Sequence, residues 1–191
     1  IRTGGLTITA APTITTLTPN NRGAGSSGQT ITVAGTGFAA GATSVFSGTL
    51  VTVTASTITA TSITLTVTVA TAAAAGLRSL TVTNLDGGTR TLANAFTVNA
   101  APTVTSLSPA SLARGAAATT ITVNGTNFTT GMTVAFAGTG LTLGAVTFVS
   151  ATQVRLTVAV ASTATVGLRG ITVTRTDAGR FSSTTIGLTI T

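Results

Sequence analysis

The sequence contains no cysteine, histidine, lysine, glutamate, tyrosine or tryptophan. The absence of cysteine excludes a disulfide framework, and the absence of lysine excludes an isopeptide bond between Lys and Asn side chains. The chain therefore lacks the usual nucleophiles and general bases, and its two carboxylates, Asp86 and Asp177, lie far apart in the sequence. We expect no enzyme, no metal site and no cofactor.

Charged residues are scarce, at 6% of the chain, and nine arginines against two aspartates give a net charge of +7. The arginines are scattered and form no basic run, so they mainly keep the protein soluble and attract polyanions weakly. Binding of nucleic acid requires clustered basic side chains, and single strands require aromatic platforms as well. We therefore expect no nucleic-acid partner.

Long hydrophobic runs are also missing, although 43% of the residues are apolar and the mean hydropathy is +0.60. No run approaches the roughly 18 consecutive apolar residues of a membrane-spanning helix, so we expect no membrane span. The chain begins at Ile1 without a basic segment followed by an apolar one. We expect that any secretory signal peptide has been removed, although a piece of a longer chain would look the same.

Threonine is abundant, at about a quarter of the residues by count, and it alternates with apolar residues. A period of two places one set of side chains on a buried face and the other set outside. In the clearest example the buried set is predicted to be Ile63, Leu65, Val67 and Val69. Short strands of this kind between Gly, Pro, Asn and Ser breaks are typical of an antiparallel β-sandwich. The alanine run 70–75 is too short for an isolated helix, and we predict a loop or one helical turn.

The chain also repeats itself, because its second half aligns with its first. The matched segments are Ala10 to Pro19 with Ala100 to Pro109, Thr30 to Phe38 with Thr120 to Phe128, Gly76 to Arg78 with Gly167 to Arg169, and Asp86 with Asp177. Small sandwich domains have about 100 residues. We infer two domains, residues 11–99 and 100–191, joined with almost no linker and preceded by an extra strand at residues 1–10.

Each copy contains a predicted hairpin turn at its aspartate. The turns are Leu85-Asp86-Gly87-Gly88 and Thr176-Asp177-Ala178-Gly179. We expect both aspartates to be turn residues, with a neighbouring arginine as a partner.

Each copy has a Pro-bounded first strand, a Gly-containing turn and a strand that closes in Gly-x-Gly-Phe or a variant of it. In the first copy these features and the later positions are Pro12, Pro19, Gly28, Ile31, Val33, Gly35, Gly37, Phe38, Phe46, Gly48, Gly76, Val82, Asn84, Gly87, Phe96 and Val98. In the second copy they are Pro102, Pro109, Gly115, Ile121, Val123, Gly125, Phe128, Phe136, Gly138, Gly167 and Val173.

This pattern resembles the IPT/TIG family of immunoglobulin-like domains over residues from about 11 to 191. The second copy departs from it at Asn127, which stands in the place of Gly37, and in its last strand, residues 186–190, which lacks the Phe. The resemblance implies an all-β fold of two tandem immunoglobulin-like sandwiches. It implies no catalytic residues, because the family occurs in surface proteins, extracellular receptors, accessory modules of carbohydrate-active enzymes and some transcription factors.

The N-terminal segment is not needed by either complete domain. Residues 6–12 align with residues 96–102, which contain the last strand of the first copy. One interpretation is that the segment closes a preceding repeat of a longer array. Another is that Leu6 and Ile8 insert into a neighbouring subunit as a donor strand. A disordered tail or a local edge strand also fits. Because the second copy has its own last strand, a donor strand would need an acceptor elsewhere, such as an edge.

Four further residues are candidate surface sites. Arg78 and Arg169 follow the same Gly-Leu in both copies, and we interpret them as partly exposed arginines at strand starts that discourage edge pairing. The alternative is that they contact an acidic polysaccharide or another polyanion. Asn124 and Asn127 match the N-glycosylation sequon, although chance matches are frequent in a Thr-rich chain and this segment aligns with the end of a core strand.

Two functional hypotheses follow. The first is a secreted structural subunit of an extracellular cell-surface filament, which is a head-to-tail homopolymer of sandwiches whose Thr-rich surface packs laterally or carries O-linked sugar. The low charged fraction favours such packing, because few charges lose their water. The second is a carbohydrate- or receptor-binding module of a larger adhesin-like surface protein. A filament subunit should assemble by itself, whereas a binding module should stay monomeric and require a ligand.

Overall fold

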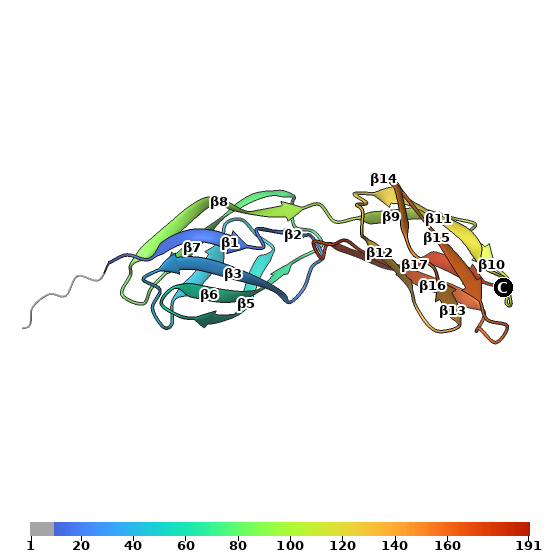
Figure 1. The fold of residues 1–191 in the computed structure, drawn as a ribbon, viewed down its shortest axis with the longest axis horizontal. Coiled ribbons are helices and arrows are strands. Elements are labelled where there is room, and N and C mark those ends of the chain that lie inside the picture. The colour runs from blue at the N-terminus through green and yellow to red at the C-terminus, as the bar shows by residue number, and fades with distance from the viewer. Residues whose placement is uncertain (1–9) are drawn as a thin grey trace, which may run out of the picture. The chain divides into compact units, whose positions relative to one another are not determined.

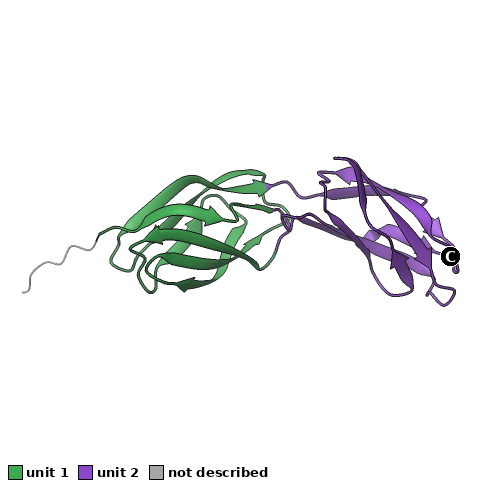
Figure 2. Cartoon of the chain, viewed as in Figure 1, with its two compact units in different colours: residues 1–22, 27–98 green, residues 23–26, 99–191 purple. Residues whose placement is uncertain are grey.

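The computed structural model describes residues 10–191, which form strands and turns but no helix (Figure 1). There is accordingly no helix in residues 10–191 that is long and apolar enough to cross a membrane. The predicted extra strand, including Leu6 and Ile8, lies outside the described residues. The chain divides into two compact units, residues 1–22 with 27–98 and residues 23–26 with 99–191 (Figure 2).

The first unit is a sandwich of two sheets. One sheet has the strand order β1-β3-β6-β5, and the other has the order β2-β8-β7-β4. The strands are β1 (Thr13–Thr18), β2 (Asn21–Gly23), β3 (Gln29–Thr36), β4 (Thr43–Phe46), β5 (Val51–Ile58), β6 (Ser62–Val69), β7 (Gly76–Thr83) and β8 (Thr89–Asn99). Residues 70–75 form a loop, as one of the two predicted alternatives had it.

The second unit repeats this arrangement with one strand divided. Its sheets have the orders β13-β15-β11-β9, with β14 also paired to β15, and β10-β17-β16-β12. The strands are β9 (Thr103–Ser108), β10 (Ser111–Leu112), β11 (Thr119–Thr126), β12 (Thr133–Phe136), β13 (Leu141–Leu143), β14 (Thr147–Ser150), β15 (Gln153–Val160), β16 (Gly167–Thr174) and β17 (Arg180–Ile190). The tandem immunoglobulin-like fold predicted from the sequence is confirmed in both units.

The period of two decides which side chains form each core. In β6 the alternate residues Ile63, Leu65, Val67 and Val69 are all buried, as the sequence predicts. The intervening threonines point to the other face of the same sheet. In the second unit β15 does the same with Val154, Leu156, Val158 and Val160.

The outer face of the sheet β1-β3-β6-β5 is rich in threonine, and Ala34, Ala55 and Ser62 also lie on it. Cross-strand neighbours on it are Thr18 with Thr32, Thr30 with Thr66, Thr32 with Thr64, Thr52 with Thr68, and Thr57 with Thr64. Each of these side chains offers a hydroxyl and a methyl group but no charge. In the second unit the exposed Arg155 of β15 interrupts the corresponding face.

One departure from the family pattern concerns backbone conformation. Gly37 has a φ of 69°, which lies in the left-handed region, and Asn127 has a φ of 57° at the same place in the second unit. Asparagine tolerates this region better than other residues with a side chain. The substitution of Asn for Gly therefore keeps the turn.

Candidate functional site

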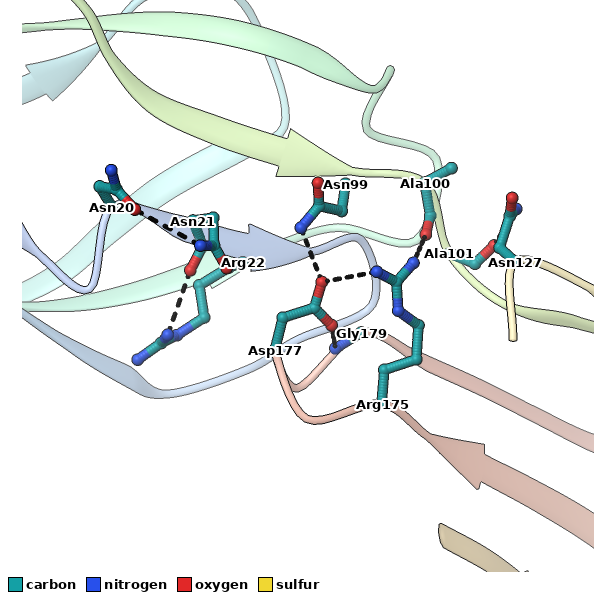
Figure 3. Close-up of polar contacts among 10 residues, drawn as sticks. All are labelled: Asn20, Asn21, Arg22, Asn99, Ala100, Ala101, Asn127, Arg175, Asp177 and Gly179. Carbon is teal, nitrogen blue, oxygen red and sulfur yellow. Dashed lines mark hydrogen bonds and ion pairs between the residues drawn. The ribbon is translucent and has the colours of Figure 1, made fainter. Parts of the chain in front are cut away.

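Polar side chains of the second unit gather around Asp177, in the turn between β16 and β17 (Figure 3). The Oδ1 atom accepts a hydrogen bond from the backbone N–H of Gly179 at 3.0 Å. The N–H of Arg175 donates to the carbonyl of Gly179 at 2.9 Å, and Ala178 has a φ of 64°. The predicted role of Asp177 as a turn residue is confirmed, because its carboxylate closes the turn upon itself.

The second carboxylate oxygen of Asp177 binds two side chains. Oδ2 accepts a hydrogen bond from Nδ2 of Asn99 at 2.8 Å and forms an ion pair with Arg175 at 3.1 Å. Arg175 also donates from Nη1 to the carbonyl of Ala100 at 2.9 Å. The side chains of Arg175 and Asp177 are only 13% and 10% exposed, so water screens this pair less than a surface pair. The expectation of a neighbouring arginine partner is confirmed for Asp177.

A backbone segment that precedes β3 packs on the same turn. Within the second compact unit, the N–H of Gly23 donates to the carbonyl of Asp177 at 3.1 Å, and the N–H of Arg180 donates to the carbonyl of Ala24 at 3.1 Å. A Cβ atom on Gly23 would collide with Cα of Gly179. The contact therefore requires glycine at position 23, and it is made by main-chain atoms.

The equivalent turn of the first unit closes in the same way but holds fewer partners. The N–H of Gly88 donates to Oδ1 of Asp86 at 2.9 Å, and the N–H of Asn84 donates to the carbonyl of Gly88 at 2.8 Å. Asp86 is exposed, and in residues 10–191 it has no ion pair like that of Asp177. The turn prediction is confirmed for Asp86, but Asn84 stands where Arg175 stands in the second unit.

The side-chain amide of Asn84 bonds to the loop after β3 and not to the turn at Asp86. Nδ2 donates to the carbonyl of Gly37 at 2.8 Å, and Oδ1 accepts from the N–H of Ala39 at 3.1 Å. The side chain is 3% exposed. Asn84 therefore fixes the loop after β3 inside its own sandwich.

Arg78 and Arg169 occupy equivalent places and make equivalent bonds. Nη2 of Arg78 donates to the carbonyl of Ala74 at 2.6 Å, and Nη2 of Arg169 donates to the carbonyl of Thr165 at 2.6 Å. Both begin their strands, as predicted, but β7 and β16 are interior strands of their sheets. Since, within residues 10–191, β4 pairs only with Leu80–Thr83 of β7 and β12 only with Ile171–Thr174 of β16, the interpretation that the two arginines discourage edge pairing stays a prediction. Each of them holds the loop before its own strand. Contact with a polyanion stays a prediction.

The two asparagines of the sequons have partners in the fold. Nδ2 of Asn124 donates to Oγ of Ser106 at 3.1 Å, and Nδ2 of Asn127 donates to the carbonyl of Ala101 at 2.8 Å. Glycosylation at Asn124 or Asn127 stays a prediction. The part of the chain that the structure describes contains no group of three or more side chains able to hold a metal ion.

The sequence alone did not indicate Asn99 or Gly23 as partners of Asp177. Both are distant from it along the chain, and a hydrogen bond of this separation leaves no periodic signal. A faint sign exists in the comparison of the two copies, since Gly23 is replaced by Ala113 in the second.

The family model for the IPT/TIG domain matches the chain twice, at residues 12–98 and 102–189. The chain belongs to the IPT/TIG family. The site around Asp177 therefore lies on the second TIG domain, but residues 23–26, which fold with it, come from the first match. No curated protein matches the chain.

Solved structures similar to this TIG pair are distant. The extracellular region of a plexin is 16% identical with a TM-score of 0.47, over 84% of this chain and 14% of that one. A titin fragment with three immunoglobulin domains is 17% identical, with a TM-score of 0.36, over 95% of this chain and 66% of that one. A surface glycan-binding protein from a xyloglucan utilization locus of Bacteroides uniformis is 20% identical, with a TM-score of 0.32, over 91% of this chain and 48% of that one. The chain spans less than two thirds of the plexin and of the glycan-binding protein.

Proposed function

We propose that the chain is a structural part of an extracellular filament at the cell surface, in which TIG sandwiches follow one another end to end. The observation that supports this is the backbone contact of Gly23 and Ala24 with the turn at Asp177. A segment from the first family match folds into the second compact unit. Main-chain contacts of this kind suit a scaffold, because they depend on glycine and turn geometry and not on a bound molecule.

The surface chemistry also favours a structural role. The outer face of the sheet β1-β3-β6-β5 presents Thr hydroxyl and methyl groups without charge. Lateral contact between two such faces removes few charges from water, which keeps the desolvation cost low. The same hydroxyl groups are the acceptors that O-linked sugar would use.

The link between subunits is proposed to be the N-terminal strand. Leu6 and Ile8 occupy alternate positions, so both would enter the same groove of a neighbouring sandwich while main-chain atoms extend its sheet. In the second unit β17 already closes the sheet, so the acceptor is an edge strand or a sandwich without its own last strand.

Electron microscopy of the concentrated, purified chain tests this proposal. The wild-type chain is expected to form filaments, and a variant with Leu6→Asp and Ile8→Asp is expected to lose them. The matched control is Leu6→Val with Ile8→Val, which keeps the apolar positions and should keep the filaments. Single particles in the wild-type sample, or filaments in the Asp variant, would contradict the donor strand.

A second candidate is a module that binds an acidic polysaccharide, and a hollow on the second unit favours it. The hollow is lined by Thr120, Ala145, Thr147, Val149, Arg155, Leu156 and Thr157. It combines one guanidinium with hydroxyl groups, which is suitable for an anionic sugar. If this candidate is correct, Arg155→Gln lowers retention on a heparin column, whereas Arg90→Gln, on the other unit, serves as the charge-matched control.

A further inference from the structure

The two aspartate turns differ in what covers them. Asp177, Ala178 and Gly179 are half-buried or buried, and residues 23–26 lie on them. Their counterparts Asp86, Gly87 and Gly88 are more exposed, and no residue among those described packs on that turn as residues 23–26 do on Asp177. Within residues 10–191, the turn at Asp86 therefore has the form of a receiving turn to which no segment bonds as residues 23–26 bond to the turn at Asp177.

From this difference we infer that the turn Asp86–Gly88 is a docking site for the loop of another TIG domain, one that reads Gly-Ala-Gly as residues 23–25 do, with the middle alanine only 1% exposed. The inference rests on the serial arrangement of sandwiches in the proposed function, but it does not require the donor strand. The expected partner is identified by the amino-acid sequence of this loop.

The requirement for two glycines follows from the occupied turn. A Cβ atom on Gly23 would collide with Cα of Gly179 and would lie 2.8 Å from Oδ1 of Asp177. Gly25 has a φ of 87°, and a Cβ atom on it would collide with the carbonyl oxygen of Arg180. A side chain at either position would hold the two backbones apart and break the bonds from Gly23 to Asp177 and from Arg180 to Ala24.

The aspartate turn also contains a glycine at the contact point in both units, Gly88 in the first and Gly179 in the second. A Cβ atom on Gly179 would lie 2.9 Å from Cα of Gly23, which real contacts do not reach. Gly88 is the counterpart of Gly179, and in the first unit its added Cβ would meet Oδ1 of Asp86 at 3.1 Å and Cδ of Pro12 at 3.4 Å. A methyl group at position 88 requires the side chain of Asp86 to shift by a few tenths of an ångström, and it would occupy the space that an incoming loop needs.

This rule makes the site selective. The loop of the second unit that corresponds to Gly23-Ala24-Gly25 reads Ala113-Arg114-Gly115, so its first glycine is absent and Arg114 stands in the place of the buried Ala24. The Cβ atom of Ala113 would meet Gly88 as a Cβ on Gly23 would meet Gly179. The second unit of a neighbouring copy is therefore excluded from the turn, and loop 23–25 of that copy already lies on its own Asp177 turn, so the occupant is a different TIG domain that carries both glycines.

Restoring the missing glycine tests the rule in the chain itself. All variants carry Leu6→Asp and Ile8→Asp, so that a donor strand cannot contribute. In this background Ala113→Gly combined with Arg114→Ala is expected to create head-to-tail association, with a dissociation constant at least about tenfold lower than that of its parent. Arg114→Ala alone, which keeps the Cβ atom of Ala113, is expected to leave the chain monomeric. Sedimentation velocity measures this as a mass that rises with concentration above the 18.5 kDa of the monomer.

Two further variants make the result specific. Adding Gly88→Ala is expected to abolish the association, because it fills the receiving turn. Ala117→Gly, an alanine-to-glycine change in the same loop outside the contact, is expected to leave the chain monomeric. Thermal unfolding confirms that each variant is folded.

Three results would overturn the inference. They are an Ala113→Gly, Arg114→Ala chain as monomeric as its parent, an association that Gly88→Ala does not reduce, and a parent that already associates through Gly88. Failure of the wild-type chain to form filaments would instead refute the donor strand and leave these results unaffected.

Discussion

The two sandwiches share a strand order and a turn, but the residue at one equivalent position, Asn84 in the first unit and Arg175 in the second, has a different role in each. In the first unit Asn84 turns inward and bonds the loop at Gly37 and Ala39. In the second unit Arg175 occupies that position and bonds Asp177 and the carbonyl of Ala100, which precedes the first strand. The comparison shows that this corner of the fold can hold either its own loop or the segment that enters the sandwich, depending on the length and charge of one side chain.

The cores differ at another equivalent position. Phe96 packs against Phe46 with ring centroids 4.9 Å apart and planes at 45°. Its counterpart by strand register is Leu188, since Phe96 pairs with Arg78 and Leu188 pairs with Arg169. Both side chains are fully buried. The second unit therefore fills the same site without an aromatic pair.

The largest effect in this comparison is expected from truncating these two core residues. Phe96→Ala should lower the free energy of unfolding of the first unit by about 4 kcal/mol, and Leu188→Ala should lower that of the second by about 3 kcal/mol. Hydrogen exchange measured during denaturant unfolding reports the free energy of unfolding of each unit separately. Phe96→Leu, which imitates the second unit, is the control and should cost less than Phe96→Ala.

The next largest loss of stability is expected from removing the buried side-chain amide of Asn84. Asn84→Ala is expected to cost the first unit about 2 kcal/mol, because the carbonyl of Gly37 and the N–H of Ala39 lose their partner in a buried place. Denaturant titration checks this. If the equivalent change Arg175→Ala destabilised the loop at Asn127 in the same way, the two residues would share one role and the comparison above would be wrong.

The paired arginines are expected to matter less and equally. Arg78→Met and Arg169→Met keep the length of the side chain but remove the bonds to the carbonyls of Ala74 and Thr165. Each should lower the free energy of unfolding by about 1 kcal/mol, since both side chains are partly exposed. Arg90→Met is a control on the surface with little expected change. A large difference between the two variants would show that the units use this residue differently.

The smallest effect concerns the aspartates. Asp177→Asn removes the charge that Arg175 pairs with and should cost about 1 kcal/mol, whereas Asp86→Asn should cost less than about 0.5 kcal/mol because its carboxylate is exposed. Thermal unfolding at low and high salt measures both. Equal losses would mean that the ion pair contributes nothing beyond the turn.

The sequence predicts the parts of this structure that are local. Alternation identified Ile63 to Val69 as a half-buried strand, and the Asp-Gly and Asp-Ala-Gly patterns identified both turns, because the physics of each acts within a few residues. The interior position of β7 and β16 in their sheets was not predictable, since strand order in a sheet depends on distant pairing. The bond from Asn99 to Asp177 has the same origin and was missed for the same reason.

The parallel pair formed by β10 and β17 has a mechanical consequence. Its bonds run from the N–H of Thr189 to Ala110, of Thr191 to Leu112, and of Arg114 to Thr191, at 2.9, 3.0 and 2.9 Å. The first of these strands lies near the start of the domain and the other at its end, so tension applied to the two ends slides them along each other. Such a shear loads all the bonds together instead of opening them one by one. We therefore expect the second unit to resist pulling along its chain better than peeling from one edge.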